Sequence, residues 1–100
     1  MVKVIWSKQA IENIHEIREH YFQISPHYAE KLTDEIFNKE EILVNFPLAG
    51  RIVPEINNIE IRELIFKNYR IIYQYSVSDA IKIIAIHQSS KPLSSFSLFR

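Results

Sequence analysis

The 100-residue sequence contains no cysteine, a single glycine and no apolar run long enough to span a membrane. Without cysteine there is no disulfide framework, no thiolate metal site and no cysteine nucleophile, which excludes several catalytic classes. The single glycine, Gly50, excludes a glycine-rich phosphate-binding loop. Because the opening segment, residues 1–6, becomes polar too quickly for a signal peptide, we expect a cytoplasmic protein with no membrane segment.

The histidines do not suggest a metal site. His15 and His20 are five positions apart, not the four that places two ligands on one helix face, and His27 stands alone. We therefore expect no metal and no cofactor. An apolar content of 47% in a chain of this length predicts one compact domain over residues 1–100.

Charge is balanced overall but unevenly distributed. The 12 basic and 12 acidic residues give zero net charge, which by itself provides no argument for nucleic-acid binding. Residues 1–50 contain 5 Lys and Arg against 8 Asp and Glu, a net charge of −3, and residues 51–100 contain 7 against 4, a net charge of +3. The basic half either faces phosphate or attracts the acidic half within the fold, and charge counting favours the second interpretation.

Periodicity in the first half predicts a strand followed by two helices. Alternation over residues 2–6 is typical of a strand with one buried face. Ser7 and Ser25-Pro26 are typical of helix starts, because serine accepts hydrogen bonds from free amides and proline at the first helical position loses none. Apolar residues then recur at helical spacing, at Ala10, Ile14, Ile17 and Tyr21 and again at Ala29, Leu32, Ile36 and Leu43. Two such helices in succession predict a helical hairpin.

The second half predicts an antiparallel meander. Proline and glycine in residues 46–50 end the second helix, and Gly50 suits a turn with positive φ. Residues 59–66, 70–75 and 81–87 are rich in Ile and Tyr and are separated by turn-like sequences. The layout is therefore α+β, an N-terminal strand, a helical hairpin and three strands, with the helices on one face of the sheet and the other face free. We expect residues 88–100 to form an irregular tail.

Four short motifs carry a family resemblance. They are Trp6 before the first helix, Phe46-Pro47 with Gly50-Arg51 after the second, Ile61-Arg62-Glu63-Leu64, and Tyr69-Arg70-Ile71-Ile72-Tyr73. Taken together, over residues 2–87, the chain resembles the RelE/ParE superfamily of toxins from type II toxin–antitoxin systems. The resemblance implies a hetero-oligomer with a cognate antitoxin whose tail wraps the toxin. RelE-like members cleave messenger RNA on the ribosome, whereas ParE-like members bind DNA gyrase and stall it, and the shared fold does not decide between them.

The RelE-like alternative needs a general base and cations that stabilise the charge on a phosphate. By carry-over from family positions, Arg62 and Arg70 on neighbouring strands form a phosphate cradle and His87 is the base, on one face with Ile83 and Ala85. The competing interpretation is that Arg62 either forms an ion pair within the chain, with Glu60 or Glu63 nearby, or lies on a solvated sheet edge, and that His87 is a structural histidine. The residues expected to contact phosphate or a target are Arg51, Arg62, Lys67, Arg70 and Lys91. Tyr73 and Tyr75 are expected in the core.

The segment after His87 favours the ParE-like alternative. Ribonuclease members commonly follow this strand with Arg and then Tyr, whereas this chain reads His87-Gln88-Ser89-Ser90-Lys91-Pro92. The catalytic set is incomplete, and a neutral chain is poorly suited to the phosphate surface of the ribosome. We therefore expect a non-enzymatic toxin that binds gyrase. The alternatives are a RelE-like endoribonuclease acting on ribosome and messenger RNA, and a degenerate member that has lost toxicity and serves as a binding partner.

The tail contains more apolar surface than a free terminus usually exposes. Its apolar residues are Leu93, Phe96, Leu98 and Phe99. Because so much apolar area is rarely left in water, we expect these side chains either to pack back over the sheet or to dock on a partner.

Overall fold

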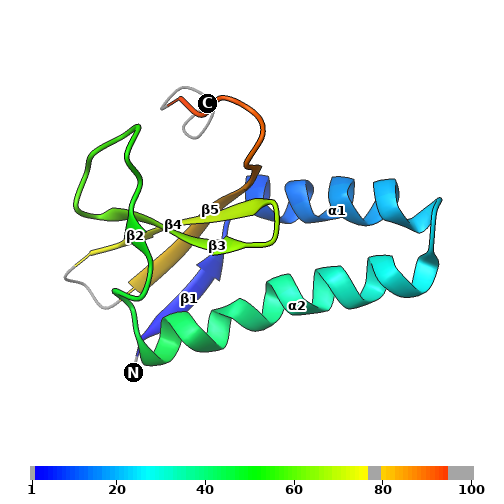
Figure 1. Cartoon of the computed structure of the whole chain (residues 1–100). Helices are drawn as coiled ribbons and strands as arrows, with labels where there is room; N and C mark the ends of the chain where they lie inside the picture. Colours follow the sequence, from blue (N-terminus) through cyan, green and yellow to red (C-terminus); the bar gives the residue numbers. More distant parts are fainter. Residues whose placement is uncertain (1, 77–79, 95–100) are drawn as a thin grey trace.

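The computed structural model describes residues 2–76 and 80–94, which form two helices and one five-stranded sheet (Figure 1). The elements are β1 (Lys3–Trp6), α1 (Lys8–Phe22), α2 (Pro26–Asn45), β2 (Arg51–Ile52), β3 (Ile61–Phe66), β4 (Tyr69–Tyr75) and β5 (Ala80–Gln88). The α+β layout predicted from the sequence is confirmed. Strand β2 was not predicted, because two residues are too few to show an alternating pattern.

The strand order in the sheet is β1-β5-β4-β3-β2. Strands β2 to β5 pair antiparallel, as the predicted meander requires, whereas β1 lies parallel to β5 at the edge. Only one face of β1 is half-buried, at Val4 and Trp6, so the expectation of a well-buried strand face is corrected. Trp6 Nε1 donates a hydrogen bond to Glu40 Oε1 at 2.6 Å, which ties β1 to α2.

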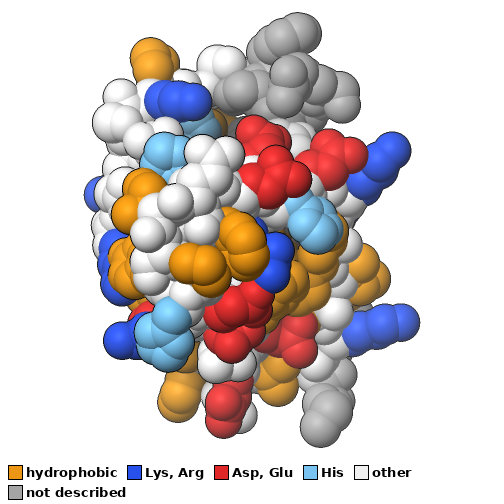
Figure 2. Space-filling view, turned by 90° about the vertical axis from the view of Figure 1, so that its right-hand side faces the viewer, with side chains coloured by type: hydrophobic (Ala, Val, Ile, Leu, Met, Phe, Trp, Pro, Cys, Tyr) orange, Lys and Arg blue, Asp and Glu red, His pale blue; other side chains and the backbone are white. Residues whose placement is uncertain are grey.

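Both helices begin at the predicted serines. Ser7 Oγ accepts from Ala10 N at 3.0 Å, and Ser25 Oγ accepts from Tyr28 N at 3.2 Å. The helices run side by side as a hairpin and extend past the end of the sheet (Figure 1). At the end where α1 joins α2, carboxylates and histidines are interleaved with apolar side chains (Figure 2).

Apolar side chains form one cluster on each face of the sheet. Between the helices and the sheet lie Ala10, Ile14, Ile17, Leu32, Ile36, Leu43, Tyr69, Ile71, Tyr73, Ile81, Ile83 and Ile86. This cluster confirms the predicted helical stripes and the core position of Tyr73, with Tyr75 packed against its edge. A smaller cluster on the opposite face contains Val53, Ile61, Ile72, Ile84, Ala85 and Leu93. The face expected to be free is therefore partly covered by the chain itself.

Gly50 departs from the sequence expectation. Its φ is not positive; the two positive φ angles among the described residues belong to Asn57 and Lys67, at 53° each. The glycine is required by a close approach instead, since a Cβ at this position would lie 2.5 Å from Glu63 O and 2.8 Å from the Tyr73 ring. The turn after α2 therefore passes directly against β3 and β4.

Within residues 2–76 and 80–94, no helix combines the length and apolar character needed to cross a bilayer. Across the same residues no three His, Asp or Glu side chains gather as metal ligands would.

Candidate functional site

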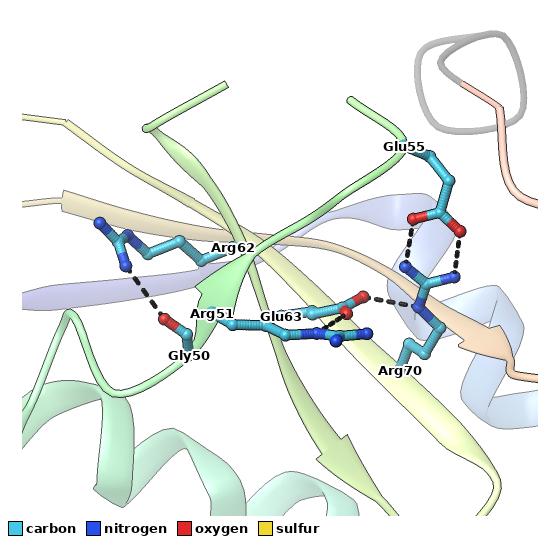
Figure 3. Close-up of polar contacts among 6 residues, drawn as sticks. All are labelled: Gly50, Arg51, Glu55, Arg62, Glu63 and Arg70. Carbon is cyan, nitrogen blue, oxygen red and sulfur yellow. Dashed lines mark hydrogen bonds and ion pairs between the residues drawn. The ribbon is translucent and has the colours of Figure 1, made fainter. Parts of the chain in front are cut away.

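A buried carboxylate binds two arginines on the sheet face opposite the helices (Figure 3). Glu63 comes from β3 and is 1% exposed. Its Oε2 accepts from Arg51 Nε and its Oε1 from Arg70 Nε, each at 2.6 Å. The register places Arg51 of β2 directly opposite Glu63. A buried charge is tolerated at this position because both oxygens accept hydrogen bonds from charged donors.

The remaining nitrogens of Arg70 bind a second carboxylate. Nη1 and Nη2 donate to the two oxygens of Glu55 at 2.7 and 2.6 Å (Figure 3). These hydrogen bonds lower the pKa of Glu55 to about 2 despite the opposing effect of partial burial. The same bonds are the largest cause that raises the pKa of Arg70 above its ordinary value. All three guanidinium nitrogens of Arg70 are thus engaged within the chain.

The resulting network carries no net charge. Arg51 and Arg70 contribute +2, and Glu55 and Glu63 contribute −2. Such a network holds β2, β3, β4 and the segment after β2 together, but it provides no net positive charge for a phosphate. These ion pairs form within the second half of the chain, whereas Lys67 and Glu35 form one between the two halves.

Arg62 and Arg70 lie on opposite faces of the sheet. Arg62 directly precedes Glu63 in β3, and successive side chains of a strand point to opposite faces. Arg70 binds Glu63 on the face opposite the helices. Arg62 instead lies opposite Tyr73 in the β3–β4 register, and the Tyr73 side chain belongs to the cluster between the helices and the sheet. The two guanidinium groups therefore do not form one phosphate cradle, and that expectation was wrong. Pairing rules identify neighbouring strands, but the register decides which side chains share a face.

Arg62 instead contacts the turn after α2. Its Nη1 donates to Gly50 O at 3.1 Å (Figure 3), and its Nε is buried without an acceptor. Among the described residues Arg62 has no carboxylate partner, so the alternative pairing with Glu60 or Glu63 is also incorrect. Glu60 Oε1 accepts from Gln74 Nε2 at 3.1 Å instead.

His87 lies on the same sheet face as Ala85 but not as Ile83. The β4–β5 register shifts at Ile72/Tyr73, which pairs Ile72 with Ala85 and Tyr73 with Ile83. This irregularity breaks the strict alternation that the sequence analysis assumed, and Ile83 faces the helices while Ala85 faces away. His87 Nε2 lies 2.9 Å from Lys91 O. Because a carbonyl oxygen only accepts, Nε2 is the donor in this contact.

The other expected cations are dispersed. Lys67 lies in the β3–β4 turn, where its Nζ is 5.4 Å from the centre of the Tyr28 ring and 4.0 Å from Glu35 Oε1. Lys91 follows β5 and lines a groove along α1. Together with the neutral network and the separate position of Arg62, this placement shows that the five predicted residues do not form one cationic surface.

A groove of about 470 Å³ runs between α1 and the end of β5. Asn13 anchors the two elements, since its Oδ1 accepts from Ile86 N at 3.0 Å. Burial, followed by the hydrogen bond with Tyr21, raises the pKa of Tyr69 above its ordinary range, so Tyr69 is a neutral part of the wall. The lining is mainly polar and contains Gln9, Asn13, Glu16, Ile17, His20, Tyr21, Tyr69, Ala85, Ile86, His87, Gln88 and Lys91.

Sequence reasoning missed the α1 side of this groove. A polar residue next to the apolar stripe, Asn13 between Ala10 and Ile14, was the available signal, because a polar side chain on a buried face needs a partner. Glu16 and His20 line the groove but carry no signal that separates them from a solvent-exposed helix face. With Glu16 on α1 and Lys91 beyond β5, the groove offers both signs of charge.

Leu93 packs back onto the sheet and is largely buried in the smaller apolar cluster. Of the two expectations for the apolar tail residues, packing over the sheet or docking on a partner, Leu93 follows the first. Phe96, Leu98 and Phe99 lie outside the described residues.

Comparisons with known proteins identify the family. A family model described as the ParE toxin of the type II toxin–antitoxin system parDE matches residues 4–92. A solved structure titled "Chromosomal ParDE TA system from P. aeruginosa" superimposes with a TM-score of 0.74 over 88% of this chain and 96% of the other, at 21% sequence identity. At that identity the structural match shows the fold. A search of curated proteins gives no match.

Proposed function

Because the chain belongs to the ParE toxin family of type II toxin–antitoxin systems, we propose that it inhibits growth by binding DNA gyrase and that a cognate antitoxin neutralises it. Under this proposal the protein acts in the cytoplasm, as a binding protein and not as an enzyme. When the antitoxin neutralises it, the protein is part of a hetero-oligomer with that antitoxin.

The main support for binding over catalysis is the engagement of Arg70. A ribonuclease of the related RelE type would need Arg70, Arg62 and His87 to act on one phosphate. Arg70 is instead held by two carboxylates, Arg62 lies on the opposite sheet face, and His87 Nε2 faces a carbonyl oxygen. Freeing Arg70 for a phosphate would leave the buried Glu63 with Arg51 as its one remaining partner, which is costly because Glu63 Oε1 would lose its charged donor.

The groove between α1 and β5 is the surface we propose for the antitoxin. A volume of about 470 Å³ is sufficient for several side chains of a peptide segment. Its mainly polar lining favours a segment that carries both charged and polar side chains. Lys91 at one end and Glu16 on α1 would fix the direction of that segment.

Two assays performed side by side test the proposed function. Purified chain is added to a gyrase supercoiling reaction and to a translation reaction in which messenger RNA cleavage is measured, each with and without the cognate antitoxin. We expect inhibited supercoiling, intact messenger RNA, and relief of the inhibition by antitoxin. Cleaved messenger RNA with normal supercoiling would establish the RelE-like alternative. No growth defect on controlled expression without antitoxin would establish the non-toxic alternative.

A further inference from the structure

The turn that joins α2 to β2 exposes two large apolar side chains. Phe46 is 67% exposed and Leu48 is 60% exposed. Ile42, one helical turn before Phe46, is also exposed. Single exposed apolar residues are ordinary, but a group of this kind within one short segment is typical of an interaction site.

The same turn is held in a defined shape. Tyr73 Oη donates to Pro47 O at 2.8 Å and accepts from Gly50 N at 3.0 Å. Ala49 N donates to Phe46 O at 2.9 Å, which closes the turn itself. A turn that is fixed before binding loses little conformational freedom when a partner covers it, so Phe46 and Leu48 are suited to act as anchors.

The turn also has a cation without a counter-charge. Arg62 Nη1 binds Gly50 O, its Nε is buried without an acceptor, and none of the described carboxylates pairs with it. Arg51 and Arg70, the two other arginines of the sheet, both bind carboxylates. A partly buried guanidinium that lacks a counter-ion favours a carboxylate supplied from outside the chain, which forms a charge-assisted hydrogen bond.

We propose that Phe46, Leu48 and Arg62 form a docking surface, the turn patch, for a protein segment that sets a carboxylate on Arg62 and apolar side chains over Phe46 and Leu48. The inference rests on the proposed function, under which this segment belongs to gyrase. None of the three residues lines the α1–β5 groove. Variants can therefore separate target binding from antitoxin binding.

Two patch variants and one matched control test the turn patch. The patch variants are Phe46→Ser with Leu48→Ser, and Arg62→Gln, with Arg62→Lys as the form that keeps the charge. The control is Phe22→Ser with Ile24→Ser, which removes the same kinds of exposed side chain from the end of α1 and from the connection to α2. Circular dichroism and thermal unfolding verify that each variant is folded. Phe46→Ala with Leu48→Ala replaces the serine pair if that pair does not fold.

Three quantities are measured: the toxin concentration that half-inhibits gyrase supercoiling, the affinity for the cognate antitoxin, and growth inhibition in cells. We expect both patch variants to need at least about tenfold more toxin for half-inhibition and to lose growth inhibition, as the removal of binding anchors predicts. The control stays within about twofold of the wild type, Arg62→Lys recovers part of the inhibition, and antitoxin affinity stays within about twofold.

Other outcomes overturn the inference in distinguishable ways. If the wild type inhibits gyrase and the patch variants inhibit it equally, the turn patch is not the gyrase surface, while the proposed function stands. If the patch variants lose antitoxin affinity and keep gyrase inhibition, the antitoxin occupies the patch and the assignment is wrong. If the wild type does not inhibit gyrase, the proposed function fails and the assignment of gyrase to the patch fails with it.

Discussion

Tyr73 accepts a hydrogen bond from Gly50 N at 3.0 Å, across 23 positions of sequence, and its ring lies where a side chain on residue 50 would have to go. The hydroxyl at the end of the fully buried Tyr73 side chain thereby joins β4 to the turn after α2. The only glycine of the chain is needed for this close approach, and not for an unusual φ.

Gly50→Ala should lower the free energy of unfolding by about 1–3 kcal/mol, the usual cost of overpacking a rigid site. The new Cβ would lie 2.5 Å from Glu63 O, a backbone atom of the paired strand β3 that cannot move cheaply. Urea denaturation at constant pH measures the change. Tyr73→Phe is the matched control and should cost about 2 kcal/mol, because it removes two hydrogen bonds of about 1 kcal/mol each without adding volume. An unfolding free energy for Gly50→Ala within about 0.5 kcal/mol of wild type would contradict the conclusion that the close approach to β3 and β4 requires glycine.

Glu63→Gln should destabilise the chain by about 3 kcal/mol, the lower end of the range for removing one partner of a buried ion pair. Arg70 would lose the carboxylate that binds its Nε, although Glu55 would remain, and Arg51 can turn toward water because more than half of its side chain is exposed. Denaturation curves for Glu63→Gln and Glu55→Gln should show the larger loss for Glu63. A larger loss of stability for Glu55→Gln would instead show that the contact of Arg70 with Glu55 stabilises the fold more than its contact with Glu63.

Stability should fall on acidification in a window set by Glu55. Its pKa is lowered from an ordinary value of 4.5 to about 2, mainly by hydrogen bonds from Arg70. A group whose folded pKa is depressed stabilises the fold above its unfolded pKa, so this contribution is complete above about pH 4.5 and is lost as the pH falls toward 2. The melting temperature of wild type and of Glu55→Gln, measured across this range, should differ most at the upper end. Because Glu55 is 39% exposed, added salt should shrink the difference.

His87→Ala should leave growth inhibition intact. The imidazole Nε2 contacts Lys91 O, Arg70 is engaged elsewhere, and Arg62 lies on the other sheet face. Growth curves under controlled expression, with messenger RNA integrity measured in the same cells, provide the comparison. Loss of both toxicity and messenger RNA cleavage in the variant would instead assign a catalytic role to His87.

The family, the α+β layout and the helix starts were accessible from the sequence. Ser7 and Ser25 mark the helix starts because capping depends on residues three positions apart, and the apolar stripes depend on neighbours three and four positions apart. These interactions are local, so a single chain read in order contains them.

Register, counter-ions and close approaches were decided only by the tertiary structure. The register shift in β5 separates His87 from Ile83, the alternation of β3 separates Arg62 from Arg70, and Glu55 reaches Arg70 from 15 positions away. Each of these outcomes depends on which distant residues meet. Periodicity states that a strand has two faces, but only pairing with its neighbours decides which face each charge occupies and which carboxylate neutralises it.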